Sequence, residues 1–268
     1  VSVGAVNLAA VLLAQDTRAD ADYLEEPWAQ ALPTFPVEGG AVTATVSDAQ
    51  GRFNINNLAQ PTPRDTALFR QLLSSAKLDP NTIDAVMDWI DSDNTPRAAG
   101  AEDDYYGTLP APYRAANQPF ASVDELRLVK GFTPEAVRAL RPFLVALPVS
   151  NAKINVNTAS KDVLAALLPA VDVGSIEQFV HEREKNPVVK CAEEMKARFG
   201  QEIDCSATTE FFDVIIDTEF GRVHRRTQAL LQRKNTKEPA TILWQRRYYD
   251  KDIRIAPAKD DEDRSART

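Results

Sequence analysis

The spacing of apolar residues predicts a helix at the start of the chain and strands soon after it. Between positions 3 and 13, apolar side chains cover most of the helical circumference, which is typical of a helix buried on more than one side. From position 36 the period changes to two, with Val42, Ala44 and Val46 on one face of a predicted strand. A hairpin-like turn then leads to a second short strand at Phe53 and Ile55.

Residues 64–207 read as helices separated by turn residues. One of these helices begins with Asp79 as N-cap and Pro80 in its first turn, and apolar residues then recur along one face. Strand periodicity returns from Phe211 to about Tyr248. The order of helix, strands, helices and strands predicts an α+β fold in which a large all-α domain is inserted into an antiparallel sheet.

These changes of pattern also give the expected domain limits. The first part of the helix-and-sheet domain is predicted at 1–60 and the inserted helical domain at 61–207. The returning strands are predicted at 208–256. The highly charged residues 257–268 are predicted to form a disordered tail.

The composition is that of an ordinary globular protein, with 44% hydrophobic residues in a chain of 268. A formal net charge of −8 argues against general affinity for DNA or for anionic lipid. The two cysteines, Cys191 and Cys205, are compatible with one disulfide in an oxidising compartment or with two free thiols in the cytosol. Zinc is not expected, because His181 and His224 do not stand at finger spacing from them.

An acidic stretch follows the predicted helix that ends near Ile90. Counted from Asp91, oxygen-bearing side chains fall at positions 1, 3, 5 and 12, which is the spacing of a calcium-binding loop. Pro96 stands where an EF-hand needs glycine, so the alternatives are a calcium loop of another kind or a solvated acidic surface loop. The candidate calcium ligands are Asp91, Asp93, Thr95, Glu102, Asp103 and Asp104.

No phosphate-binding glycine loop, nucleophile elbow or metalloprotease motif is present in the sequence, so an enzyme is not expected. Two segments resemble helix-hairpin-helix units, which makes a nucleic-acid-binding module the alternative function. The first unit keeps Gly131, but the second has Ala170 where the hairpin glycine should be, which removes the close backbone approach that a phosphate needs. We therefore interpret the pair as a scaffold without a DNA-binding role and expect no nucleic-acid partner.

A basic cluster accompanies the C-terminal strands and is the other conceivable phosphate surface. Several of its members alternate with apolar residues, which favours the solvated face of a sheet over a binding site. The members are Arg222, Arg225, Arg226, Arg233, Lys234, Arg246 and Arg247.

Three stretches in this order closely resemble the K-type minor pseudopilin of the bacterial type II secretion system: YLEEPWAQALPTFPVEGGAVTATVSDAQGRFNINNL, VMDWIDSDNTPRAAGAEDDYY and KINVNTAS. The resemblance covers essentially the whole chain. It implies a pilin-like domain with an inserted α-domain, no active site, and Ca²⁺ in the α-domain. The apolar membrane helix that opens the family's proteins is not in this sequence, so the resemblance implies the periplasmic part of a protein anchored in the inner membrane.

The resemblance also implies partners and a role at the tip of the pseudopilus. The expected partners are the I-type and J-type minor pseudopilins, with exported proteins and the outer-membrane secretin as further candidates. A periplasmic location makes a Cys191–Cys205 disulfide the default. In the pilin-like arrangement the N-terminal helix packs on the sheet with one side and meets partner helices with the other. The expected partner-binding residues are Val3, Val6, Leu8, Val11, Leu12 and Leu13.

Overall fold

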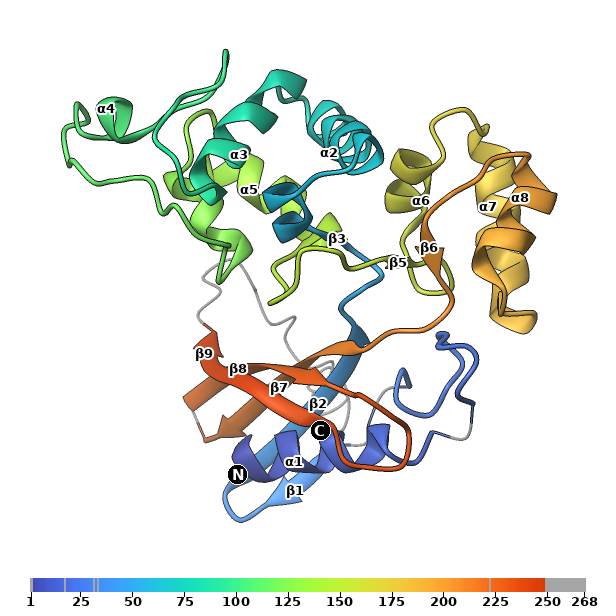
Figure 1. The fold of residues 1–268 in the computed structure, drawn as a ribbon. Coiled ribbons are helices and arrows are strands. Elements are labelled where there is room, and N and C mark those ends of the chain that lie inside the picture. The colour runs from blue at the N-terminus through green and yellow to red at the C-terminus, as the bar shows by residue number, and fades with distance from the viewer. Residues whose placement is uncertain (1, 17, 31, 33, 222, 249–268) are drawn as a thin grey trace, which may run out of the picture.

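The computed structural model describes residues 2–16, 18–30, 32, 34–221 and 223–248. The fold consists of a sheet domain, which comprises α1, β1, β2 and β7–β9, and a helical domain formed by the chain between β2 and β7 (Figure 1). The predicted α+β fold with a helical insertion in the sheet is therefore confirmed. The predicted tail at 257–268 and the last part of the returning segment lie outside the described residues.

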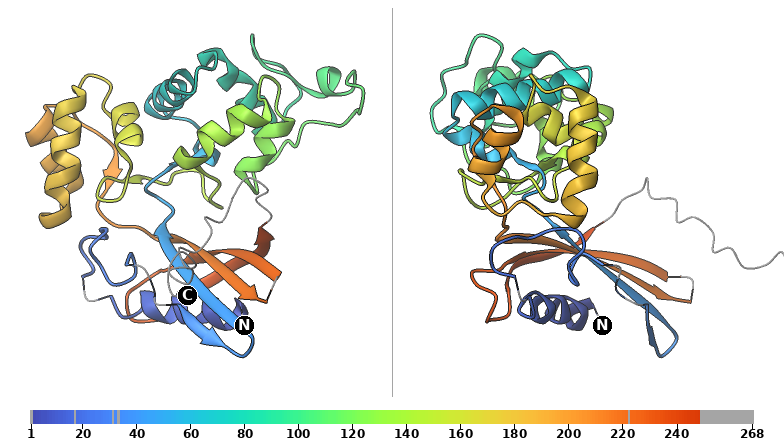
Figure 2. Two further views of the ribbon diagram at one scale, coloured as in Figure 1. Left: turned by 180° about the vertical axis from the view of Figure 1, so that it is seen from behind. Right: turned by 90° about the vertical axis from the view of Figure 1, so that its right-hand side faces the viewer.

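In the part of the chain that the structure describes, the sheet domain contains five antiparallel strands in the order β1-β2-β7-β8-β9. Their inward residues, such as Val46, Val214 and Ala229, meet the buried side of α1 and form a separate core. Figure 2 shows α1 on one face of the sheet and the helical domain on the other side. The bounds are Ser2–Leu13 for α1, Phe35–Val37 for β1, Gly40–Asp48 for β2, Phe211–Phe220 for β7, Val223–Gln232 for β8 and Thr241–Tyr248 for β9.

The helical domain has its own large core, to which Phe53, Ile55 and Leu58 already belong. Its helices are α2 (Pro63–Ser75), α3 (Ile83–Ile90), α4 (Asp103–Tyr106), α5 (Pro134–Leu140), α6 (Lys161–Leu167), α7 (Val173–Lys185) and α8 (Cys191–Phe199). Its 3-10 turns are η1 (Ile55–Ala59), η2 (Pro80–Thr82), η3 (Val123–Leu128) and η4 (Arg141–Phe143). Its short strands are β3 (Phe53–Asn54), β4 (Leu144–Val145), β5 (Ile154–Asn155) and β6 (Cys205–Ser206).

The predicted strand at Phe53 does not form a hairpin with β2. Phe53 pairs in parallel with Leu144, inside the helical domain, whereas β2 pairs with β1 and β7. The predicted limit at residue 60 is therefore too late, because the chain enters the helical domain directly after β2. The cause is that pairing between distant segments leaves no trace in a local alternation of apolar and polar residues.

A buried polar network joins the two domains. Asp48, at the end of β2, accepts hydrogen bonds from Asn155 Nδ2 (2.8 Å) and Thr158 Oγ1 (2.6 Å) of the helical domain. Asn155 Nδ2 also donates to the Asp22 carbonyl (2.9 Å), while the Asp22 carboxylate pairs with Arg233 at the end of β8. Because buried polar groups are costly when unpaired, this network fixes the helical domain on the sheet in one orientation.

Candidate metal centre and assembly surface

The acidic loop begins where α3 ends. Ile83, Val86 and Ile90 of α3 are buried in the helical core, so the end of this helix is held firmly in place. The loop that follows connects α3 to α4, and it brings the carboxylates of Asp91, Asp93 and Glu102 together. One oxygen from each lies within 4.8 Å of the other two. Three converging carboxylates form the kind of oxygen-rich site that Ca²⁺ prefers.

Glu102 is the most unusual member of this cluster. It is 2% exposed, and neither of its carboxylate oxygens has a hydrogen-bond partner among the described residues. Oδ1 of Asp91 is likewise buried and unpaired. Burial raises the pKa of Glu102 to about 7, and the negative charges of Asp88, Asp91 and Asp93 add to the effect. Unpaired buried carboxylate oxygens are costly, which fits a site completed by a cation.

Arg97 supplies positive charge on only one side of the loop. Its Nη1 donates to Asp88 Oδ1 (2.6 Å) and also pairs with Asp91 Oδ2. Ion pairs of this guanidinium with Asp93 or Glu102 do not occur in the described part of the chain. The arginine therefore orients Asp91 but leaves the oxygens that face Glu102 without a counter-charge.

Two of the predicted acidic ligands, Asp103 and Asp104, do not belong to the cluster of converging carboxylates. Thr95 is exposed, and its backbone N–H donates to Asp93 Oδ1 (2.8 Å). Asp103 instead accepts a hydrogen bond from the Ala115 N–H (3.0 Å), and Asp104 is exposed on the first turn of α4. The expectation for these residues rested on spacing and acid density, which do not indicate the direction of a side chain.

Asn117 is a candidate ligand that the sequence did not reveal. Its Oδ1 is buried and has no hydrogen-bond partner among the residues that the structure describes, and its Nδ2 donates to the Asp93 carbonyl (3.3 Å). The residue has a φ of 47°, in the left-handed region that asparagine tolerates better than most residues. It lies in a different loop, 24 residues from Asp93, so no local spacing could have linked the two.

A second acidic cluster lies at the end of α1, where Asp16, Asp22 and Glu26 converge. Here Arg233 provides the positive charge, through Nη1 to Asp16 Oδ2 (2.6 Å) and through Nη2 to Asp22. Glu26 Oε2 accepts from Trp28 Nε1 (2.7 Å). Burial is the main cause that raises the pKa of Glu26 to about 7 and that of Asp22 to about 6. This cluster differs from the one around Glu102, because a guanidinium already balances part of its negative charge.

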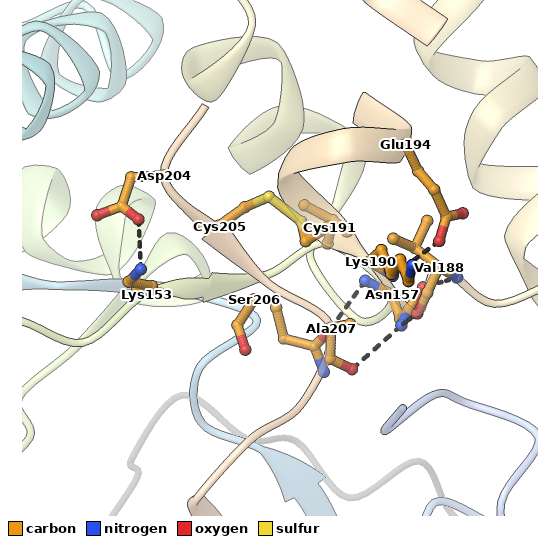
Figure 3. The surroundings of a disulfide bond; sticks show 12 residues. Lys153, Asn157, Val188, Lys190, Cys191, Glu194, Asp204, Cys205, Ser206 and Ala207 are labelled. Carbon is orange, nitrogen blue, oxygen red and sulfur yellow. Dashed lines mark hydrogen bonds and ion pairs between the residues drawn. A yellow bond between two sulfur atoms is a disulfide. The ribbon is translucent and has the colours of Figure 1, made fainter. Parts of the chain in front are cut away.

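Cys191 and Cys205 are joined in a disulfide, with a Cα–Cα distance of 6.0 Å (Figure 3). The bond ties the start of α8 to β6, the strand that leads back to the sheet domain. Asn157 reinforces the same region, because its Nδ2 donates to the carbonyls of Val188 (2.8 Å) and Ala207 (3.2 Å). The C-terminal end of the helical domain is thus fixed both by the disulfide and by the buried side-chain amide of Asn157.

Helix α1 divides the six predicted partner-binding residues into two groups. Val3, Leu8 and Val11 are exposed by 61%, 49% and 44%. Val6 and Leu13 are completely buried against the sheet, and Leu12 is half-buried against the same core. The prediction is therefore wrong for Val6 and Leu13, because helical periodicity turns these two toward the sheet. We call the exposed set, Val3, Leu8 and Val11, the outer row.

The helix-hairpin-helix segments are not arranged to hold a phosphate. Gly131 has a φ of 89°, and a Cβ there would lie 2.8 Å from Cγ2 of Thr82, so the glycine serves packing within the domain. In the second unit, the carboxylate of Asp172 caps α7 by accepting from the Ser175 N–H (2.9 Å). A carboxylate thus occupies the helix N-terminus that would attract an anion.

Comparison with known proteins agrees with this fold. The family described as type II secretion system, protein K, matches residues 51–149 and 154–202. The protein K of Pseudomonas aeruginosa is 35% identical over 235 residues, which cover 82% of this chain and 69% of that protein. The chain belongs to the type II secretion system protein K family. This is a family of structural minor pseudopilins, in agreement with the expectation that the chain is not an enzyme.

Two further relatives define the extent of the similarity. The type II secretion system protein K of Pectobacterium carotovorum is 39% identical over 185 residues, or 63% of this chain. The chain spans 56% of that relative, a little over half of its length. The crystal structure of the GspK-GspI-GspJ complex from enterotoxigenic Escherichia coli contains a chain with a TM-score of 0.76 and 25% identity. That match covers 93% of this chain and 94% of the other. The pilin-like nature of the sheet domain is thereby confirmed.

Proposed function

We propose that this protein K assembles with I-type and J-type minor pseudopilins at the tip of a type II secretion pseudopilus. The outer row of α1 carries this proposal, because three large apolar side chains on one helix face are poorly suited to water. The solved relative, whose chain matches along nearly its full length, comes from a complex of GspK with GspI and GspJ. At the tip, the chain would take part in the start of assembly and would contact exported proteins or the secretin.

The position of the helical domain supports a place at the tip. Helix α1 and the helical domain lie on opposite sides of the sheet (Figure 2). If α1 packs beside partner helices, the helical domain projects from the bundle, and its bulk blocks the addition of another subunit above it. Such a block would make the chain the cap of the pseudopilus.

The location we propose is the periplasm, with anchoring in the inner membrane through a segment outside this sequence. Within the described residues, no helix has the length and apolar character needed to cross a bilayer. The Cys191–Cys205 disulfide supports an oxidising compartment, because such bonds persist there and are rare in the cytosol.

We further propose that the loop between α3 and α4 binds Ca²⁺ through Asp91, Asp93 and Glu102, with Asn117 Oδ1 as an additional ligand. The unpaired buried oxygens of Glu102, Asp91 and Asn117 support this assignment. The ion would supply positive charge among carboxylates that otherwise repel one another. Asp91 lies at the end of α3 and Glu102 at the start of α4, so the ion would hold the two helices together.

The assembly is tested by mixing the purified chain with the periplasmic domains of its I-type and J-type partners. Light scattering is expected to give the mass of a one-to-one-to-one complex. A mixture in which the chain remains alone at its own mass would contradict the proposal. The metal site is tested separately, by elemental analysis of the purified protein.

A further inference from the structure

Among the described members of the basic cluster on the C-terminal strands, some form ion pairs with carboxylates and others do not. Arg233 is buried against Asp16 and Asp22, and Arg226 forms two hydrogen bonds with Asp217 (2.6 and 2.7 Å). Arg225, Arg246 and Arg247 are exposed, and none of them forms an ion pair with any residue that the structure describes. Their positive charge stands out in a protein with a net charge of −8.

Arg246 and Arg247 lie on β9, the last strand of the sheet, whereas Arg225 lies on β8. Among the described residues β9 pairs only with β8, so its other edge presents backbone N–H and C=O groups without strand partners (Figure 1). Arg246 lies opposite Gln228 and Arg247 opposite Thr227, so their side chains emerge on opposite faces of the sheet. A strand added to this edge would meet one arginine on each face.

Trp244 lies beside this edge, on the face that carries Arg246. The Arg246 guanidinium stacks over the Trp244 ring at 4.5 Å, and its Nη2 lies 3.3 Å from both Ser122 Oγ and Gln228 Oε1. These residues line a groove of about 230 Å³ between the sheet and the helical domain. Tryptophan and arginine together are typical of residues that dominate binding energy in protein interfaces.

We propose that the free edge of β9 receives an extended acidic segment of a partner protein by strand addition. Backbone hydrogen bonds to β9 would provide affinity, and pairing with Arg246 and Arg247 would provide specificity. In antiparallel register the segment carries two adjacent acidic residues, then any residue, then an apolar residue that covers Trp244. In parallel register the same pattern runs in reverse. This inference does not depend on the role of α1.

The test uses the full chain and an eight-residue peptide with two adjacent glutamates, a threonine and then a phenylalanine. Trp28 and Trp89 are 2% and 3% exposed, so quenching of tryptophan fluorescence by acrylamide reports mainly on Trp244. We expect the peptide to protect the fluorescence in a saturable manner. The same peptide with lysines in place of the glutamates is expected to bind at least tenfold more weakly. N-methylation of the peptide on its pairing edge is expected to abolish binding.

The matched variant is R246E/R247E, which keeps Trp244 and the strand. The variant is expected to bind the lysine peptide and no longer to bind the glutamate peptide. General damage to the strand would not reverse the preference in this way. Charged residues on edge strands can also serve only to prevent aggregation, and in that case no peptide binds and the proposal is overturned. The proposal is also overturned if the peptide binds only to a variant in which the four acidic residues at 260–263 are replaced by their amides. In that case the acidic segment that occupies the edge of β9 belongs to this chain and not to a partner.

Discussion

Glu102 lies buried next to Asp91, with a carboxylate oxygen of each residue within 4.8 Å of the other. Neither Glu102 oxygen has a hydrogen-bond partner within the described residues, and Oδ1 of Asp91 is also unpaired. Two like charges at this distance in a partly dry site destabilise the loop unless a cation or a proton intervenes. From this relationship we predict that the stability of the loop depends on a bound cation.

Calcium is therefore expected to raise the melting temperature of the chain relative to a chelator. At a calcium concentration one hundred times the Kd, the stabilisation is about 2.7 kcal/mol. For a protein of this size that corresponds to a shift of roughly 5 to 10 °C. Differential scanning calorimetry with calcium and with chelator measures it.

The variant Glu102→Gln provides the sharper comparison. It should lose the response to calcium and, in chelator, melt no lower than the wild type, because it removes an unpaired buried charge. The control Asp104→Asn changes an exposed residue outside the cluster and should keep the full response. An equal calcium shift in the wild type and in Glu102→Gln would show that these carboxylates do not bind the ion.

Stability is expected to depend on pH through the cluster around Arg233. Burial raises the pKa of Glu26 to about 7 and that of Asp22 to about 6, above the values of an unfolded chain. The folded state therefore binds more protons than the unfolded state between about pH 4 and 7, so the free energy of unfolding falls as pH rises through this window. The loss from pH 5 to pH 8 should be on the order of 1 to 3 kcal/mol.

Urea denaturation at the two pH values tests this dependence. Glu26→Gln keeps an acceptor for the Trp28 indole but cannot ionise, so its stability should vary less with pH than that of the wild type. The remaining variation reports on Asp22 and the other titrating groups. A variant with the same pH profile as the wild type would exclude Glu26 as a source.

The disulfide should contribute measurably to stability. Closing the loop between Cys191 and Cys205, which are 14 residues apart, is worth about 3 kcal/mol in the chain-entropy model. The double variant C191A/C205A should therefore unfold at lower urea concentration. Thiol titration of denatured, unreduced protein from a periplasmic preparation should find no free thiols, and finding two would contradict the prediction.

Local pattern was enough to predict much of this fold. Alternation of apolar and polar residues identified β2 and β8, strand-forming residues identified β7 and β9, and the apolar circumference identified α1, because these signals lie within single elements. The spacing of oxygens likewise indicated Asp91, Asp93 and Glu102, which one loop brings together. Asn117 could not be found in this way, because it comes from another loop and its position depends on tertiary structure. The pairing of Phe53 with Leu144 was hidden for the same reason.

Substitutions on α1 should separate assembly from folding. Leu8→Glu places a charge on the outer row, where the side chain is 49% exposed, so the melting temperature of the isolated chain should change little. The same charge would be buried without a partner in the complex, so light scattering with I-type and J-type domains should show no complex. Val6→Ala removes completely buried methyl groups and should have the opposite profile, with a destabilisation of roughly 1 to 3 kcal/mol and normal assembly. If Leu8→Glu still assembles with wild-type affinity, the partners bind a surface other than the outer row.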